Sequence, residues 1–230
     1  MLRNGGVTNT DLNVFCLFLY PQSVFNMTAS TLPLPPAKPK TRRYTEAEYL
    51  EMERTSEQKH SFVNGLIFPM AGASFPHIVI SGNIFGQLFK VLEDSLDFAL
   101  LSNETKIYLP QLHIYHYPDA LVVAGQPEFA SEEVGAILNP ILIIEVLSDS
   151  TGRFDRFEKF THYQTLPSFR EYILIHQDSP QIDSFLRQEE PDLWRSSEVS
   201  GLDSEVHFQS IDVKIALSKI YRNVSFETAE

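Results

Sequence analysis

The chain contains little cysteine, no long apolar run and few basic residues over most of its length. Cys16 is the only cysteine among 230 residues, which excludes an intrachain disulfide and favours a reducing, cytoplasmic setting. The apolar run at residues 14–20 is far shorter than the roughly 20 residues that a membrane span needs, so we expect no membrane partner. Residues 44–230 carry 13 Lys or Arg against 29 Asp or Glu, a net charge of −16. Any contact with DNA must therefore depend on a local basic patch or on bound metal.

Several familiar enzyme motifs are also absent. The sequence has no G-x-S-x-G, no P-loop and no dinucleotide-binding glycine fingerprint. His113 and His116 are three positions apart and would face opposite sides of a strand, while His77 and His162 have no second ligand at a recognisable spacing. These absences argue against a serine hydrolase, a P-loop or Rossmann nucleotide site, and a zinc site.

The first 43 residues differ in composition from the rest. They hold five Lys or Arg against one acid, and residues 31–43 include four prolines. We predict a disordered N-terminal extension and proline-rich linker over residues 1–43, followed by a single domain over 44–230. Met27 is a plausible alternative start, and a signal segment around residues 14–20 is the less favoured alternative.

Local patterns predict a mixed fold. Thr45 and Glu48 fit a capping box for a helix through about Arg54, and Asn64-Gly65 between short apolar runs predicts a hairpin with a type I′ turn. Apolar residues at helical spacing predict the longest helix over residues 74–92. The order of elements indicates an α/β or α+β class, with a mixed β-sheet flanked by helices. Further strands are predicted near 98–101, 106–109, 112–115, 120–124, 141–147, 171–176, 181–186, 193–199 and 206–208, and a last helix near 217–221.

Two acidic residues lie in apolar runs. Glu145 is the one charge in residues 141–147, a run typical of a strand that is buried on both faces, and Asp119 opens the apolar run 120–124. A charged group in such a strand is costly unless it is paired or binds a cation. The two acids could converge on one Mg²⁺ ion. The alternatives are an ion pair of Glu145 with Arg153 or Arg170, and a turn or capping role for Asp119.

A polar stripe is expected on the next helix, which Ser150-Thr151 would cap and which would run to about Thr165. Asp155, Lys159 and Tyr163 are spaced four apart and would share a face. If this helix packs beside the strand end, Lys159 could reach the two acids. The alternative is an ordinary solvated face with an Asp–Lys pair. Leu147 occupies the strand position where a metal nuclease often has its lysine.

These residues resemble the Uma-type restriction-endonuclease family, a branch of the PD-(D/E)XK nuclease superfamily. The resemblance implies a restriction-endonuclease-like fold in which Asp119 and Glu145 match the metal-binding acids. Lys159 matches a lysine that has moved from the strand to the helix. The resemblance is carried by residues 117–123 and 139–148, Ser150-Thr151, Asp155, Lys159, Tyr163, Pro167-Ser168 and Glu171-Tyr172, and it extends from about Tyr44 to Tyr221.

One position departs from the family pattern. The family commonly has a glutamate just before the hairpin, where this chain has Ser61, so one acid of the expected cluster is missing. Glu57 lies four residues earlier and could share a helix face with position 61, which would be a weak replacement.

Three functions remain open from the sequence. The first is a Mg²⁺- or Mn²⁺-dependent endonuclease that hydrolyses DNA phosphodiesters, with activity weakened by Ser61, acting alone or as a homodimer. The second is a catalytically silent module that keeps the nuclease fold for binding or assembly, favoured by Ser61, Leu147 and the acidic domain. The third is a metal-dependent hydrolase of a small phosphorylated molecule, which would tolerate the acidic domain better than DNA would.

Overall fold

A computed structural model describes residues 42–70, 72–131, 134–148, 152, 154–190 and 193–226. The predictions for the N-terminal extension and Met27 fall outside these residues, except for Arg42 and Arg43. The predicted Ser150-Thr151 cap and Arg153 also lie outside them.

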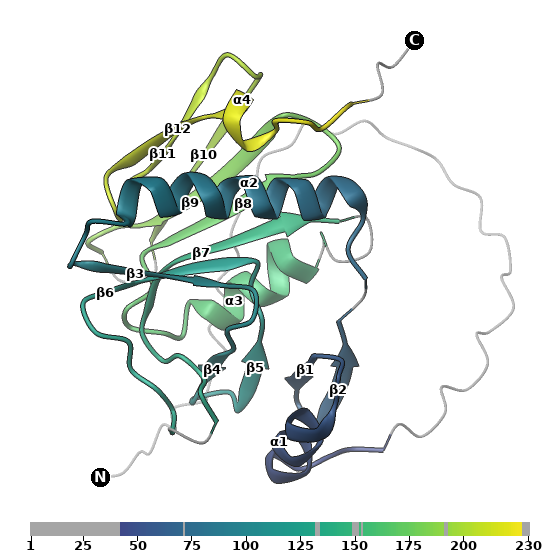
Figure 1. The fold of residues 1–230 in the computed structure, drawn as a ribbon. Helices are drawn as coiled ribbons and strands as arrows, with labels where there is room; N and C mark the ends of the chain where they lie inside the picture. Colours follow the sequence, from purple (N-terminus) through teal and green to yellow (C-terminus); the bar gives the residue numbers. More distant parts are fainter. Residues whose placement is uncertain are drawn as a thin grey trace, which may run out of the picture. The chain divides into compact units, whose positions relative to one another are not determined.

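A six-stranded mixed sheet forms the centre of the fold (Figure 1). Its strand order is β10-β9-β8-β7-β6-β3, and only the β7–β8 pair is parallel. This arrangement confirms the predicted mixed sheet, and its two central strands are those with nearly continuous apolar runs. The strands are β3 (Phe98–Ser102), β6 (Ala120–Ala124), β7 (Pro140–Leu147), β8 (Glu171–His176), β9 (Gln181–Arg187) and β10 (Trp194–Ser200).

Two smaller sheets flank the central one. A four-stranded sheet has the order β2-β1-β5-β4, and β11 pairs with β12 in an antiparallel hairpin. The predicted Asn64-Gly65 turn joins β1 to β2, and the φ angles of its two residues are +51° and +80°, as a type I′ turn requires. The bounds are β1 (His60–Val63), β2 (Leu66–Pro69), β4 (Ile107–Leu109), β5 (Ile114–His116), β11 (Glu205–Phe208) and β12 (Val213–Ala216).

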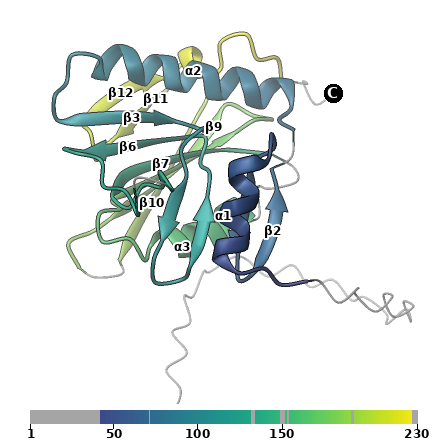
Figure 2. The same ribbon diagram turned by 60° about the horizontal axis from the view of Figure 1, so that its bottom comes forward.

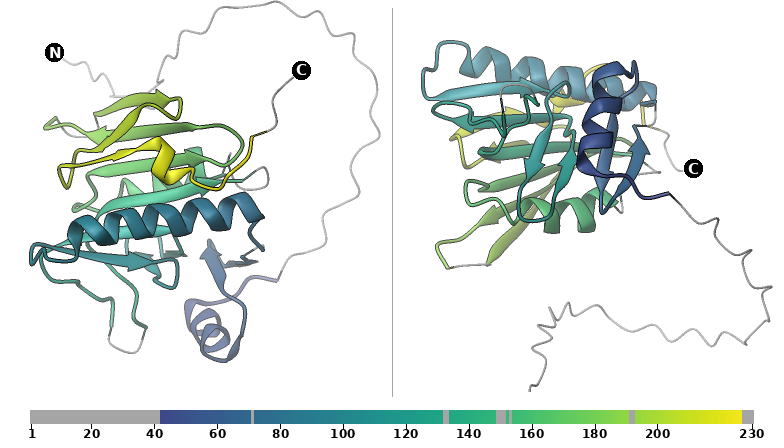
Figure 3. Two further views of the ribbon diagram at one scale, coloured as in Figure 1. Left: turned by 45° about the horizontal axis from the view of Figure 1, so that its top comes forward. Right: turned by 90° about the horizontal axis from the view of Figure 1, so that it is seen from below.

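The two faces of the central sheet have different covers. Helix α2 (Phe75–Leu92), the β11–β12 hairpin and α4 (Leu217–Ile220) pack on one face, around Val122, Ile144 and Ile173. Strands β4 and β5 and helix α3 (Phe160–Tyr163) pack on the other face, as Figures 2 and 3 show. Because side chains alternate along a strand, Ile144 and Val146 lie on the α2 side, whereas Ile143 and Leu147 lie on the α3 side. This alternation also assigns Glu145 to the α3 side.

Most predicted helices and strands are confirmed, with two exceptions. The predicted capping box starts α1 (Glu46–Thr55), and Ser74 caps α2. The helix after β7 was expected to be a regular α-helix, but Phe154–Lys159 is a π-helix that continues into α3. Strand β12 was not predicted, although its alternating residues Val213 and Ile215 are buried. Within the described residues, no helix combines the length and the apolar character needed to cross a membrane.

Candidate functional site

Asp119 and Glu145 lie at the same end of two adjacent strands. Strands β6 and β7 pair Leu121 with Ile143 and Ala120 with Ile144, so the next step of this antiparallel register sets Asp119 opposite Glu145. The Asp119 side chain reaches the neighbouring strand directly, because its Oδ2 accepts a hydrogen bond of 2.7 Å from the Val146 amide. The two acids are therefore near neighbours.

Helix α2 holds the other oxygen of Asp119. His77 Nε2 donates to Asp119 Oδ1 over 2.8 Å, and Ser81 Oγ donates to the same oxygen over 3.4 Å. The Asp119 side chain is 13% exposed. The turn or capping alternative is not what the structure shows, since its partners lie 27 to 42 residues away along the chain. No spacing pattern in the sequence marks His77 as a partner of Asp119, so this contact could not be predicted.

Glu145 is buried and paired with the next helical segment. Lys159 Nζ lies 2.9 Å from Glu145 Oε1, and the Tyr163 hydroxyl donates to the same oxygen over 3.1 Å. The alternative partner Arg170 instead donates to the Pro167 carbonyl, at 2.6 Å. The lysine on the helix thus reaches the strand acid from the side, as the sequence suggested.

Asp155 completes an ion cluster with Glu145 and Lys159. Its Oδ1 lies 2.8 Å from Lys159 Nζ, and the residue is only 2% exposed. The expectation of an ordinary solvated helix face is therefore wrong, because this face packs against the sheet. The Tyr172 hydroxyl donates to the Asp155 carbonyl at 2.9 Å and so anchors the π-helix to β8.

The electrostatics of this cluster are governed by burial. The pKa of Glu145 is raised to about 8, because loss of water penalises its charged form and outweighs the opposing effect of the Lys159 ammonium. Burial alone would lower the pKa of Lys159, but Glu145 and Asp155 reverse this effect and raise it above its ordinary value. With both acids ionised, two carboxylates face one ammonium. Because the pKa of Glu145 is about 8, this surplus of negative charge arises only as the pH approaches or exceeds that value, and it would then favour a further cation.

The oxygen donors fit a magnesium ion with few protein ligands. Among the described residues, no group of three or more His, Cys, Asp or Glu side chains is placed to hold a metal ion. Mg²⁺ is commonly bound through one or two carboxylates, with water and substrate phosphate completing its coordination. Asp119 and Glu145 would supply such a pair. Both also carry protein hydrogen bonds, so an incoming ion would have to share or displace a donor.

The structure places both Ser61 and Leu147 in β-strands, as the sequence predicts for Leu147. Ser61 lies in β1 opposite Phe68, and Leu147 is buried in the apolar layer on the α3 side. The suggested replacement by Glu57 is wrong, because Glu57 is exposed and lies after α1 ends, where it shares no helix face with a strand residue. The acid missing at position 61 is therefore not supplied by Glu57.

Comparisons with known proteins agree with this architecture. The family model "Uma2: Putative restriction endonuclease" matches residues 46–218. The uncharacterized protein sll1609 of Synechocystis sp. (strain ATCC 27184 / PCC 6803 / Kazusa) is 31% identical over 173 residues, which are 75% of this chain and 97% of that protein. The uncharacterized protein slr1290 of the same strain is 31% identical over 179 residues, which are 78% of this chain and 92% of that protein.

The fold is shared with a solved structure. The crystal structure of a protein from Anabaena variabilis ATCC 29413, described as a putative nuclease belonging to DUF820, aligns with a TM-score of 0.62. It is 16% identical in sequence, and the alignment covers 77% of this chain and 97% of that one. Since the family model spans the described fold from α1 to α4 and includes the acidic cluster, the chain belongs to the Uma2 family of restriction-endonuclease-like proteins.

Proposed function

We propose that the chain is a metal-dependent endonuclease that hydrolyses DNA phosphodiesters, with Mg²⁺ or Mn²⁺ as its cofactor. The observation that carries this proposal is the buried cluster of Glu145, Lys159 and Asp155 beside Asp119. A buried ion cluster contributes little to stability compared with apolar residues of similar volume. Its position at the ends of β6 and β7, together with the raised pKa of Glu145, is typical of a functional site.

In this proposal Asp119 and Glu145 hold the ion. A bound Mg²⁺ supplies polarisation of the phosphate and a lowered pKa for an attacking water. Lys159 is held in place by Glu145 and Asp155, so its ammonium is positioned to offset negative charge on the phosphate without reorganising. His77 orients Asp119, and Tyr163 orients Glu145.

The activity is expected to be weak. Ser61 offers a neutral hydroxyl where the family commonly has a glutamate, so one charge and one ligand are missing from the cluster. The net charge of −16 over residues 44–230 opposes binding of a polyanion. We therefore expect cleavage mainly at low ionic strength, where a small number of contacts between basic residues and phosphates is enough to bind DNA.

A catalytically silent binding module is the second candidate. It is favoured by the hydrogen bonds that already occupy both oxygens of Asp119 and one oxygen of Glu145. In this alternative the cluster would be structural, and its acids would remain bound to protein donors when Mg²⁺ is added.

Cleavage of supercoiled plasmid DNA tests the proposal. The wild type is compared, with Mg²⁺ and with Mn²⁺ at low salt, with Asp119→Asn and Lys159→Met, and the matched control is Asp203→Asn, which changes an exposed acid far along the chain. Nicking that requires metal, is lost in the two site variants and is kept in the control supports the proposal. Nicking that persists in both site variants, or its absence even at high protein concentration, contradicts it. A parallel assay with bis-(p-nitrophenyl) phosphate reports hydrolysis of small phosphate diesters.

A further inference from the structure

Helix α2 has an apolar stripe on the side that faces away from the sheet. Its members recur at intervals of three or four residues, so they lie along one face of the helix. The three large side chains are 72%, 58% and 53% exposed. The outer stripe of α2 consists of Phe75, Ile78, Gly82, Gly86 and Phe89.

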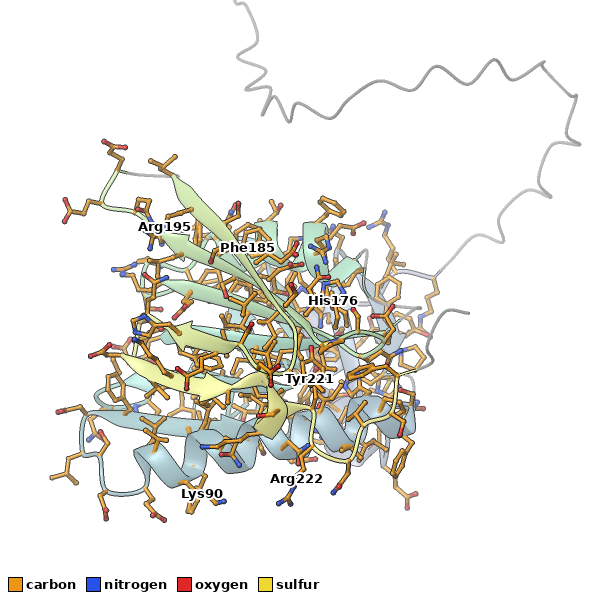
Figure 4. All side chains as sticks on the ribbon, turned by 90° about the horizontal axis from the view of Figure 1, so that it is seen from above. Lys90, His176, Phe185, Arg195, Tyr221 and Arg222 are labelled. Atoms are coloured by element: carbon orange, nitrogen blue, oxygen red, sulfur yellow. The ribbon has the colours of Figure 1, made fainter. Side chains whose placement is uncertain are left out.

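The opposite side of α2 is apolar as well. Ile80, Ile84 and Leu88 are fully buried against the central sheet. Lys90 is the one charged residue within the helix, and Figure 4 shows it at the C-terminal part, projecting away from the sheet. Two opposite faces of α2 are thus apolar, with Asn83, Gln87 and Lys90 on the flank between them, whereas a surface helix normally has a polar outer face. The outer stripe therefore has the composition of a covered surface.

Packing within the single chain does not require glycine at positions 82 and 86. A Cβ atom added at Gly82 or at Gly86 would meet no other atom within 4 Å, and neither residue has the positive φ angle that favours glycine. Glycine is unfavourable within a helix, so these positions need another explanation. Small residues spaced four apart allow a second helix to approach closely, with backbone against backbone.

We infer that the outer stripe of α2 binds the same stripe of a second copy of this chain, with the two helices antiparallel. A two-fold axis between Gly82 and Gly86 sets each of these glycines opposite the other one in the second copy. Counted outward from this axis, Ile78 of one helix lies opposite Lys90 of the other. Phe75 likewise lies opposite Glu93. The ring of Phe89 consequently lies between Ile78 and Gly82 of the second copy, where the missing side chain leaves room for it.

The charges favour this orientation. The first turn of α2 contains no acid, although its free amide groups carry partial positive charge. Glu93 and Asp94 directly follow the helix and are exposed. In the antiparallel pair these two acids come next to the first turn of the other α2, whereas a parallel pair would place them beside their own copies.

The apolar area that this contact would bury indicates a weak dimer. Taking about 200 Å² for a large apolar side chain, the three exposed side chains contribute on the order of 400 Å² per copy. Twice that value is below the area of a standard stable interface. We therefore expect a dimer that forms at micromolar to submillimolar concentration and dissociates on dilution. This inference does not depend on nuclease activity.

Sedimentation of the full-length chain over a concentration series tests the dimer. The wild type should pass from monomer to dimer, and Gly82→Gln or Gly86→Gln should weaken association at least tenfold. Both changes place a side chain in open space and improve helix propensity, so the melting temperature of the dilute protein should not fall. The matched control is Leu202→Gln, which alters an exposed apolar residue between β10 and β11 and should leave association unchanged.

A charge reversal tests the orientation. The double change Glu93→Lys and Asp94→Lys should weaken an antiparallel dimer, because it brings positive charge to the first turn of the other helix. A wild type that stays monomeric at several hundred micromolar overturns the inference. Association that survives both glycine changes also overturns it, since the contact would then lie elsewhere, and a strengthened dimer in the charge-reversed variant overturns the antiparallel arrangement.

Discussion

Replacing Lys159 with methionine should convert the buried ion cluster into a pair of carboxylates without a cation. Methionine keeps most of the apolar stem but removes the ammonium that lies 2.9 Å from Glu145 and 2.8 Å from Asp155. Both acids are nearly fully buried, at 3% and 2% exposure. Removing one partner from a buried ion pair costs about 3–5 kcal/mol, so we expect a loss of that size at pH 8.

The loss should depend on pH in a defined direction. Without the ammonium, the pKa of Glu145 rises further above its ordinary value, so the folded state binds more protons than the unfolded state. Stability must then fall as the pH rises from about 4.5, the ordinary value, through the raised folded pKa of Glu145. The destabilisation should therefore be smallest near pH 5 and largest at pH 8.

Urea denaturation at several pH values between 5 and 8 measures this effect. The double variant Lys159→Met with Glu145→Gln should recover part of the loss, since only Asp155 then remains without its cation. Arg42→Met, in an exposed pair with Glu48, serves as the control and should show no comparable dependence on pH. A loss below about 1 kcal/mol at pH 8, with no pH slope, would mean that the cluster is solvated, and the reasoning would be refuted.

Four further changes have defined expected outcomes. Glu171→Ala should cost about 2–4 kcal/mol in urea denaturation, because two partly buried amides and a hydroxyl of the β11–β12 turn lose their acceptor, and a loss under about 1 kcal/mol would contradict this. Ser61→Glu should tighten Mg²⁺ and raise cleavage, and adding Asp119→Ala should abolish the gain; robust wild-type cleavage unchanged by the first substitution would exclude position 61 from the cluster. Mg²⁺ affinity should increase from pH 6 to 8, because Glu145 must release its proton, and a flat profile would oppose its role as a ligand. Removing residues 1–41 should leave the melting temperature unchanged, and a drop of several degrees would show that they dock on the domain.

The predictable parts of the fold rest on local signals. The Thr45–Glu48 capping box and the Asn64-Gly65 turn act over a few residues, so each could be recognised without knowledge of the rest of the chain. The acids Asp119 and Glu145 were visible because each interrupts or opens an apolar run. The contact of Lys159 with Glu145 could be anticipated only as one of two arrangements, since spacing does not reveal which helix face packs inward.

The parts that could not be predicted depend on tertiary placement. His77 is 42 residues from Asp119, and their hydrogen bond exists only because α2 crosses the end of β6. The π-helix over Phe154–Lys159 lacks a sequence signature such as proline or glycine within it. Burial of Asp155 likewise follows from the placement of its helix against β8, where the Tyr172 hydroxyl donates to the Asp155 carbonyl, and not from the pattern of its own helix.

Calorimetric titration of the full-length chain with Mg²⁺ tests the central claim most directly. The account predicts binding of about one ion per chain, weak because of Ser61, and its loss in Asp119→Asn and in Glu145→Gln, while Asp203→Asn binds as the wild type does. Titration at low ionic strength and pH 8 gives a clearer signal than titration at neutral pH, since the pKa of Glu145 is about 8 and a larger fraction of its carboxyl is then ionised. Absence of binding under these conditions, or binding that persists unchanged in both site variants, would contradict a metal site at the ends of β6 and β7.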